Sequence, residues 1–265
     1  MCYYYGQKVS RDEYIRLKDV ERQWLREQSP YPVINGFNYP KCTVLKATDD
    51  RRDFELADME WGFIPNYIRT REDVKKMRSG YKDAKGFRPP LTMLNARSDE
   101  MLKPGKVFRD AVLKRRCLVL ATGFYEWQHV YPINKKTGEP LKTANKYPYS
   151  ISVKDKPYFY MAGIWQPWTD KETGEYVETF AIVTTEANSL MAQVHNSKLR
   201  MPTILDDERA YQWLFGDLSE DQILELGVNQ CPTEEMGAFT IPPNFRELEE
   251  PGTAFVYEGL APLVL

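Results

Sequence analysis

Apolar and polar residues alternate with short, changing periods along this chain, and these periods predict a mixture of strands and helices. Residues 10–13 have the form of a helix-capping box, and apolar residues then recur at helical spacing, which predicts an amphipathic helix over 11–27. Further helices are expected at 107–114, 187–193, 206–215 and 220–226. Strands are expected at 42–47, 53–60, 116–122, 149–153, 157–164, 176–184 and 254–257.

The order of these elements indicates the fold class. Strands and helices are intermixed without a regular βαβ alternation, and turn-like compositions at 134–138 and 170–174 predict hairpins. Residues 65–90 are polar, basic and interrupted by Gly and Pro, so they are predicted to form a long surface excursion. We therefore expect an α+β fold over 1–265: a single domain built on a largely antiparallel, barrel-like sheet with surrounding helices.

The composition excludes several classes of protein. The 265 residues are 42% apolar and 28% charged, and the longest apolar runs are far shorter than the roughly 18 residues that a membrane span needs. No secretory signal is visible, so a cytoplasmic protein in a reducing compartment is expected. The four cysteines form no C-x-x-C pair, and we therefore expect neither a metal site nor a cofactor.

The formal net charge of −2 hides an uneven distribution. Residues 66–116 contain 15 Lys and Arg against 6 Asp and Glu, which gives this tract a net charge of +9. Such a tract can bind nucleic acid, or it can be an ordinary solvated, lysine-rich surface. Charge alone leaves both interpretations open.

The second residue carries unusual chemistry once Met1 is removed. A small residue at position 2 favours that removal, so the mature chain is expected to begin with Cys2. The α-amine and the thiol have reference pKa values of about 7.7–8.0 and about 8.5, so both have a reactive fraction near pH 7. The amine can form an imine with an aldehyde, and the thiol can then close on the imine carbon to give a thiazolidine. The alternative interpretation is a small residue near a flexible end.

Several motifs follow Cys2 in a recognisable order. They are Trp61-Gly62-Phe63-Ile64-Pro65, Leu94-Asn95-Ala96-Arg97-Ser98, Arg115-Arg116-Cys117-Leu118-Val119, Gly123-Phe124-Tyr125-Glu126-Trp127, Phe180-Ala181-Ile182-Val183-Thr184-Thr185, and His195-Asn196 before Arg200-Met201-Pro202. Together these residues resemble the SRAP family, the SOS-response-associated peptidases or abasic-site-processing proteins. The resemblance covers roughly residues 2–215, which leaves 216–265 as a C-terminal helix and tail.

The resemblance implies a sensor of abasic sites in single-stranded DNA that acts in the response to DNA damage. In this family the N-terminal cysteine crosslinks to the abasic aldehyde as a thiazolidine, and a lyase activity through the imine is a further implication. The motif positions carry over as the catalytic residues Cys2, Asn95, Glu126 and His195. We expect a monomer whose partner is single-stranded DNA and which joins the nucleoid when DNA is damaged.

The chemistry suggests a role for each of these groups. Opening the cyclic abasic sugar and losing water from the carbinolamine both need proton transfer, which Glu126 can perform. The chain has only two histidines, and His195 is expected to assist ring opening. Asn95 can both donate and accept hydrogen bonds, so it can orient the amine or the sugar hydroxyls. The structural alternatives are an ion-paired carboxylate, a core histidine and a turn asparagine.

Basic and aromatic side chains around the motifs are expected to contact DNA. Arginines can bind phosphates, and aromatic rings can stack on exposed bases, although core packing is an equal alternative for Trp61. The expected contacts are Arg97, Arg115, Arg116, Arg200, Trp61, Tyr67 and Trp127.

The chain departs from the family pattern in three places. Tyr3-Tyr4 stand where Gly-Arg is common, and Tyr67 stands where Trp is common. The segment between His195 and Arg200 is longer than usual, which leaves the position of Arg200 relative to the site open.

Three other functions compete with this interpretation. A thiol peptidase could use Cys2 and His195, but no recognisable oxyanion loop accompanies them. A non-covalent binder of modified or single-stranded DNA would leave no adduct that survives denaturant. A β-rich interaction protein is disfavoured by the basic tract and the clustered motifs.

Overall fold

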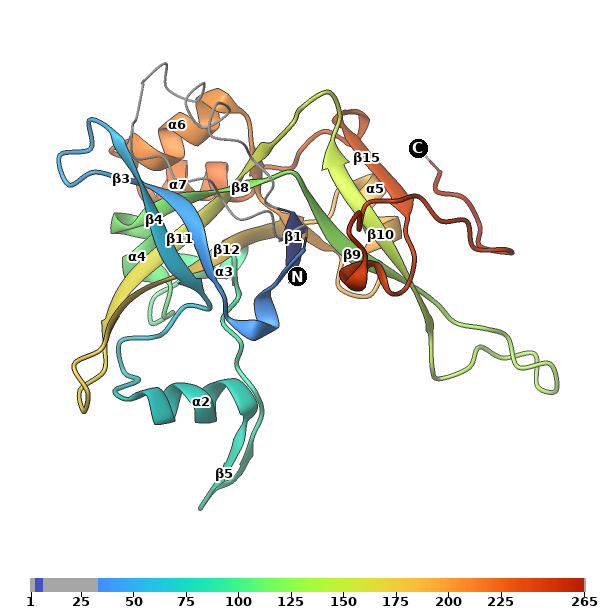
Figure 1. The fold of residues 1–265 in the computed structure, drawn as a ribbon, viewed down its shortest axis with the longest axis horizontal. Helices are drawn as coiled ribbons and strands as arrows, with labels where there is room; N and C mark the ends of the chain where they lie inside the picture. Colours follow the sequence, from blue (N-terminus) through green and yellow to red (C-terminus); the bar gives the residue numbers. More distant parts are fainter. Residues whose placement is uncertain (1–2, 7–32, 265) are drawn as a thin grey trace.

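The computed structural model describes residues 3–6 and 33–264, which form two larger sheets, a small hairpin and surrounding helices (Figure 1). Cys2 and the helix predicted at 11–27 lie outside the described residues. Within the described part of the chain, no helix is both long enough and apolar enough to cross a membrane.

Five strands of the larger sheet close into a barrel. Around the barrel the order is β12, β4, β3, β8, β11 and again β12. Every neighbouring pair is antiparallel except β4 and β12, which run parallel with Glu60 beside Thr179. The strands are β3 (Lys41–Ala47), β4 (Phe54–Trp61), β8 (Arg116–Ala121), β11 (Phe159–Thr169) and β12 (Tyr176–Glu186). The expected α+β fold on a largely antiparallel, barrel-like sheet is thus confirmed.

Short strands extend the barrel beyond its closure. Strand β7 (Asn95–Arg97) runs parallel to the second half of β12, and β13 (Arg200–Pro202) runs antiparallel to the end of β12. Strand β14 (Ile204–Leu205) pairs with β11. The end of β12 therefore brings together segments that lie about a hundred residues apart in the sequence.

A second sheet lies beside the barrel, with the order β15, β10, β9, β1, β2. Its strands are β1 (Tyr4–Gly6), β2 (Ile34–Asn35), β9 (Gly123–Val130), β10 (Asn145–Val153) and β15 (Met236–Thr240). Strand β1 is antiparallel to β9, with Tyr5 beside Phe124 and Gly6 beside Gly123. The start of the chain is thereby paired with the strand that carries Glu126.

Alternate residues of the barrel strands enter two apolar clusters, as the twofold periodicity of a strand requires. Val119 and Ile182 belong to a cluster shared with Phe124 of the second sheet, and α5 (Ser189–Val194) packs on it. Leu118 and Val183 belong to a cluster covered by helices. These helices are α3 (Ser98–Met101), α4 (Arg109–Lys114), α6 (Asp207–Phe215) and α7 (Glu220–Gly227).

The predicted surface excursion at 65–90 contains more regular structure than the sequence indicated. It holds α2 (Arg71–Ser79) and a hairpin of β5 (Tyr81–Asp83) and β6 (Gly86–Arg88). Elsewhere most predicted elements form within a few residues, and Ser219 is the N-cap of α7, as the sequence indicated, with a complete capping box. The sequence missed β15 and most of β9, and 254–257 is not a strand.

Arg116 joins the ends of two helices inside the protein. Its guanidinium donates to the carbonyl oxygens of Trp213 (2.6 Å) and Gly216 (2.6 Å) near the end of α6. It also donates to those of Val112 (3.2 Å) and Leu113 (3.1 Å) in the last turns of α4. The last carbonyls of a helix have no partner within that helix, so one buried cation satisfies groups that would otherwise be costly to bury.

We expect Arg116→Ala to lower the free energy of unfolding by about 3 kcal/mol or more, because it leaves these buried carbonyls without a donor. Arg116→Lys should recover little, since one ammonium group cannot reproduce a planar fork of donors. Lys114→Ala, at an exposed position of α4, is the matched control and should stay within about 0.5 kcal/mol. Urea unfolding followed by circular dichroism measures all three, and equal decreases for Arg116→Ala and Lys114→Ala would contradict this role.

Candidate functional site

Glu126 is buried in the middle of β9, where only 4% of it is exposed. It lies on the same face of the strand as Phe124, two residues away, which packs into the cluster under α5. Burial penalises the charged form of a carboxylate and raises the pKa of Glu126 to about 8. The side chain is therefore mostly a neutral acid at pH 7.

His195 follows the last turn of α5 and is also buried, with 6% exposed. Its Nδ1 lies 2.8 Å from the carbonyl oxygen of Arg200. Burial lowers the pKa of His195 to about 4, so the ring is neutral at pH 7 and carries one N–H proton. Nδ1 must hold this proton to donate to the carbonyl, which leaves Nε2 as the basic nitrogen.

The basic nitrogen of His195 faces the acid of Glu126, with 3.7 Å between Nε2 and Oε2. This distance exceeds that of a normal hydrogen bond. Burial favours the neutral form of each group, so we interpret the pair as an acid facing a base rather than as an ion pair. Such a pair can give a proton to a substrate and take one from it.

Asn196 fastens the loop that carries His195 to the strand that carries Glu126. Its Oδ1 accepts a hydrogen bond from the backbone N–H of His129 at 2.9 Å. Its Nδ2 donates to the backbone oxygen of His129, also at 2.9 Å. Because His129 is three residues beyond Glu126 on β9, these two bonds hold the separation between the acid and the base. The sequence indicated Asn196 only as a member of the His195 motif.

The long segment between His195 and Arg200 forms a tight turn. The backbone N–H groups of Lys198 and Leu199 both donate to the carbonyl of His195. Leu199 adopts a left-handed conformation with φ of 53°, and the chain then returns to place the carbonyl of Arg200 against the imidazole. The additional residues therefore leave Arg200 in contact with the site.

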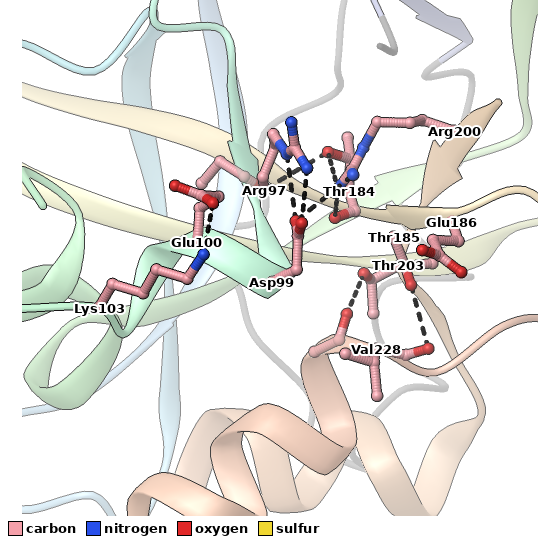
Figure 2. A network of polar contacts seen from close by, with 12 residues as sticks. Arg97, Asp99, Glu100, Lys103, Thr184, Thr185, Glu186, Arg200, Thr203 and Val228 are labelled. Carbon is pink, nitrogen blue, oxygen red and sulfur yellow. Dashed lines mark hydrogen bonds and ion pairs between the residues drawn. The ribbon is translucent and has the colours of Figure 1, made fainter. Parts of the chain in front are cut away.

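Arg97 and Arg200 approach Asp99 from β7 and β13, as Figure 2 shows. Arg97 Nη2 lies 2.5 Å from Asp99 Oδ2, and Arg200 Nη1 lies 3.4 Å from Oδ1. The hydrogen bond from Arg97 is the main reason why the pKa of Asp99 is lowered. Arg200 is buried and also donates to the backbone oxygen of Thr184 at 2.7 Å, whereas the side chain of Arg97 is 53% exposed. Arg97 is thus the better placed of the two to meet a ligand in solution.

Asn95 lies two residues before Arg97 on β7 and shares its face of the strand, while Ala96 points into the core. Both the nitrogen and the oxygen of its amide are buried, and neither has a hydrogen-bond partner among the described residues. A buried amide without partners is costly. Asn95 can therefore hydrogen-bond a ligand group that offers both a donor and an acceptor. An asparagine that only formed a turn would not need such a ligand.

The register of β1 brings the first described residue level with Glu126. Tyr5 pairs with Phe124, and continuing this antiparallel register by two residues sets Tyr3 beside Glu126. In the sequence, Cys2 is the residue directly before Tyr3.

Two predicted DNA contacts are wrong. Trp61 is fully buried, donates from its indole to the carbonyl of Leu94 at 3.0 Å and stacks in the core with Phe180, so it cannot meet a base. Arg116 is buried with its guanidinium bound to helix-end carbonyls, so it cannot meet a phosphate. In both cases the sequence showed a suitable side chain but not which way it points.

The other predicted contacts stay predictions. Tyr67 is 59% exposed just after the barrel strand β4. Trp127 is half-buried and packs edge-on against Tyr4. Arg115 is half-buried and bound to Asp110 at 2.6 Å, which reduces its availability for phosphate.

The three described cysteines, Cys42, Cys117 and Cys231, are all buried. Burial raises the pKa of the Cys117 thiol far above its usual range and that of Cys231 to about 11. No group of three or more His, Cys, Asp and Glu side chains within 3–6 and 33–264 is arranged to hold a metal ion.

Comparison with known proteins gives a consistent set of relatives. The family profile described as SOS response associated peptidase (SRAP) matches residues 1–246. The abasic site processing protein YoqW of Bacillus subtilis is 30% identical over 83% of each chain. The abasic site processing protein HMCES of Gallus gallus is 30% identical over 77% of this chain and 60% of its own length. A crystal structure of a protein from Bacteroides thetaiotaomicron superposes with a TM-score of 0.76 and 31% identity, covering 96% of this chain and all of that one.

The raised pKa of Glu126 predicts how stability depends on pH. The folded protein holds this proton more tightly than the unfolded chain, so stability falls as pH rises from about 4.5 to about 8. Glu126→Gln cannot titrate and should lose this part of the pH dependence. We therefore expect the melting temperature of the variant, relative to the unaltered protein, to rise between about pH 5 and about pH 8. Thermal melts at both pH values measure this, and a constant difference would show that Glu126 titrates normally.

Proposed function

This chain belongs to the SRAP family, and we propose that it recognises abasic sites in single-stranded DNA and forms a covalent adduct with them through Cys2. The observation that carries the proposal is the buried acid–base pair of His195 and Glu126, in which Glu126 lies on the strand that pairs with the start of the chain. The relatives named as abasic site processing proteins support the same substrate.

The proposed reaction begins with the abasic sugar as a closed hemiacetal. His195 Nε2 takes the proton of the anomeric hydroxyl, the bond between the anomeric carbon and the ring oxygen breaks, and the imidazolium returns the proton to the ring oxygen, which leaves the open-chain aldehyde with a free hydroxyl. After removal of Met1, the amine of Cys2 attacks the aldehyde carbon to give a carbinolamine. Glu126, as a neutral acid, donates a proton to the departing hydroxyl so that one water leaves, and the nitrogen then gives its proton back to the Glu126 carboxylate, which leaves a neutral imine. The thiol of Cys2 then adds to the imine carbon, and its proton passes to the nitrogen, which completes the thiazolidine.

Asn95 and Arg97 complete the proposed site. Asn95 has a buried donor and a buried acceptor available for the sugar hydroxyls or the amine of Cys2. Arg97 is exposed on the same face of β7 and can bind a neighbouring phosphate. Tyr67 and Trp127 are the aromatic candidates for stacking on unpaired bases. A monomer suffices for this arrangement, since every group comes from one chain.

The nature of the other thiols supports Cys2 as the nucleophile. The reactive species of a cysteine is the thiolate, and burial suppresses the thiolate of Cys117 and of Cys231. Cys42 is enclosed in the core of the barrel. None of these three can reach a DNA strand without unfolding.

The family description also names a peptidase, which would use Cys2 as the nucleophile and His195 as its base. We favour the aldehyde chemistry because Glu126 is a neutral acid, and a carbinolamine that must lose water uses such an acid directly. A lyase reaction is compatible with the proposal, since the imine is also the intermediate of β-elimination. A peptidase would release a peptide product and leave no DNA adduct.

We expect the protein to form an adduct with abasic single-stranded DNA that survives a denaturing gel, and Cys2→Ala to abolish it. Cys231→Ala is the matched control, because its buried thiol takes no part in the reaction. Intact-protein mass spectrometry would show both the removal of Met1 and an adduct mass lower by one water than the sum of the reactants. Equal crosslinking by the Cys2→Ala protein, without a reductant to trap an imine, would refute the thiazolidine.

We expect Glu126→Gln and His195→Ala to slow adduct formation by about 10²–10⁴-fold with little change in DNA affinity, because a positioned acid or base typically contributes that much. A preformed open-chain aldehyde bypasses ring opening, so it should restore much of the rate of His195→Ala but not of Glu126→Gln. Asn196→Ala keeps both groups and removes only the two hydrogen bonds from Asn196 to the backbone of His129. It should therefore slow the reaction less than Glu126→Gln or His195→Ala. Quenched-flow gels on both substrates give the rates, and unchanged rates in all variants would make these residues structural.

A further inference from the structure

The excursion between β4 and β7 is held to the barrel through helix α2. Val74 of α2 is buried against Ile64 and Trp168, and Arg78 of α2 donates to Glu60 at 2.7 Å and to the carbonyl of Gly62 at 2.9 Å. Glu60 and Gly62 belong to the end of β4 and to the residue after it. Helix α2 is therefore packed against the barrel, and it anchors the β5–β6 hairpin that follows it.

The hairpin of β5 and β6 extends from this base away from the rest of the molecule (Figure 1). Each residue from 81 to 88 is exposed. Gly80, at the start of the hairpin, has φ of +77°, and a Cβ there would come within 2.9 Å of the carbonyl of Arg88. The backbone N–H of Leu91 donates to the carbonyl of Met77 at 2.8 Å and closes the base from the other side. An isolated two-stranded hairpin is marginal in water, so this one depends on its anchored base to keep its conformation.

The two faces of the hairpin differ in chemistry. Residues opposite each other on paired strands project to the same side, so Lys82 and Phe87 share one face, and Tyr81 and Arg88 share the other. On the second face Arg88 is engaged with Asp83 at 2.9 Å. On the first face Phe87 is 64% exposed, and Lys82 has no ion pair within the described residues.

The free positive charge of the basic tract collects on this excursion. Most cations of 66–116 are bound within the protein, as Arg97 is to Asp99 and Arg116 is to helix-end carbonyls. Among the described residues, those of the tract without an ion pair or a side-chain hydrogen bond are Arg69, Lys75, Lys82 and Lys85. All of them lie on the excursion, and the last two belong to the hairpin. An exposed ring beside unpaired lysines is the combination that proteins use to hold single strands.

We propose that the Lys82–Phe87 face of the hairpin binds the single strand that flanks the abasic site. Phe87 stacks on a base, and Lys82 and Lys85 bind phosphates. This inference rests on the proposed function, since it takes the same DNA as its ligand. About seven residues of chain join Arg88 to Asn95, which limits the distance between them to about 25 Å. The hairpin therefore holds the strand beside the reacting sugar and adds affinity without entering the chemistry.

The test compares crosslinking on two abasic oligonucleotides, one with long single-stranded flanks and one with two nucleotides on each side. Phe87→Ala should raise the DNA concentration for half-maximal crosslinking on the long strand by about fivefold or more, and leave the saturating rate unchanged. On the short strand Phe87→Ala should behave as the unaltered protein. Tyr81→Ala removes a ring from the opposite face and is the matched control, which should change neither strand.

The charge contribution is measured without any chemistry, by fluorescence anisotropy with an undamaged single strand at several salt concentrations. Lys82→Ala/Lys85→Ala should reduce the slope of log affinity against log salt by about 1.4, because each phosphate that a lysine neutralises on a single strand contributes about 0.7 to that slope. Lys154→Ala/Lys156→Ala, on the β10–β11 connection at the opposite end of the molecule, should leave the slope unchanged (Figure 1).

The outcomes separate this proposal from the proposed function. If the hairpin variants bind and crosslink long strands normally, the hairpin does not hold DNA, whatever happens at Cys2. If their activity falls equally on long and short strands, the hairpin supports the site instead of the flank, and the proposal is also wrong. Suppose that the unaltered protein forms no adduct, but that the hairpin variants bind DNA more weakly and with a smaller salt dependence than it does. The hairpin then binds DNA, and the proposed covalent function is wrong.

Discussion

The pairing of β12 with four other strands is the constraint on which the rest of the molecule depends. Its first half closes the barrel against β11 and β4, and its second half receives β7 on one side and β13 on the other. Both parallel pairings, with β4 and β7, lie along this one strand. Because β7 carries Asn95 and Arg97 while β13 carries Arg200, the strand that closes the barrel also positions these three residues. A single strand whose residues 179–185 are all buried is stiff enough to serve both purposes.

Burial also sets the chemistry of the site. In water a glutamic acid and a histidine near pH 7 would be a charged carboxylate and a partly charged imidazole. Here the cost of removing charge from water favours a neutral acid and a neutral base, which are the forms that exchange protons with a substrate. The geometry is held by main-chain groups: the carbonyl of Arg200 orients the ring of His195, and the backbone of His129 holds Asn196.

The sequence predicted the barrel strands better than it predicted which way individual side chains point. The segments near 42–47, 53–60 and 176–184 have enough apolar residues to be read as strands because both faces of these strands are covered by apolar clusters. The strand at 236–240 carries no such signal, since it is a short edge strand with one large exposed ring, Phe239. Trp61 and Arg116 were wrongly predicted to meet DNA because composition and motif membership do not show whether a side chain points inward. The hydrogen bonds of Asn196 could not be predicted, because they join it to His129, 67 positions away in the sequence, and no local pattern records such a contact.

Arg97 and Arg116 show why a count of basic residues is a poor guide to where DNA binds. Both lie in the tract with a net charge of +9. Arg116, however, is buried and donates to the carbonyls at the ends of two helices, whereas about half of the Arg97 side chain is exposed to solvent. Once the internally bound cations are set aside, the remaining positive charge is concentrated on the excursion that begins after β4 and ends at Asn95. The basic tract thus has two separate physical roles along its length. Its second half, around α4 and β8, contributes Arg116 to the ends of two helices, and its first half carries the unpaired charge and the exposed ring that we propose bind a DNA strand.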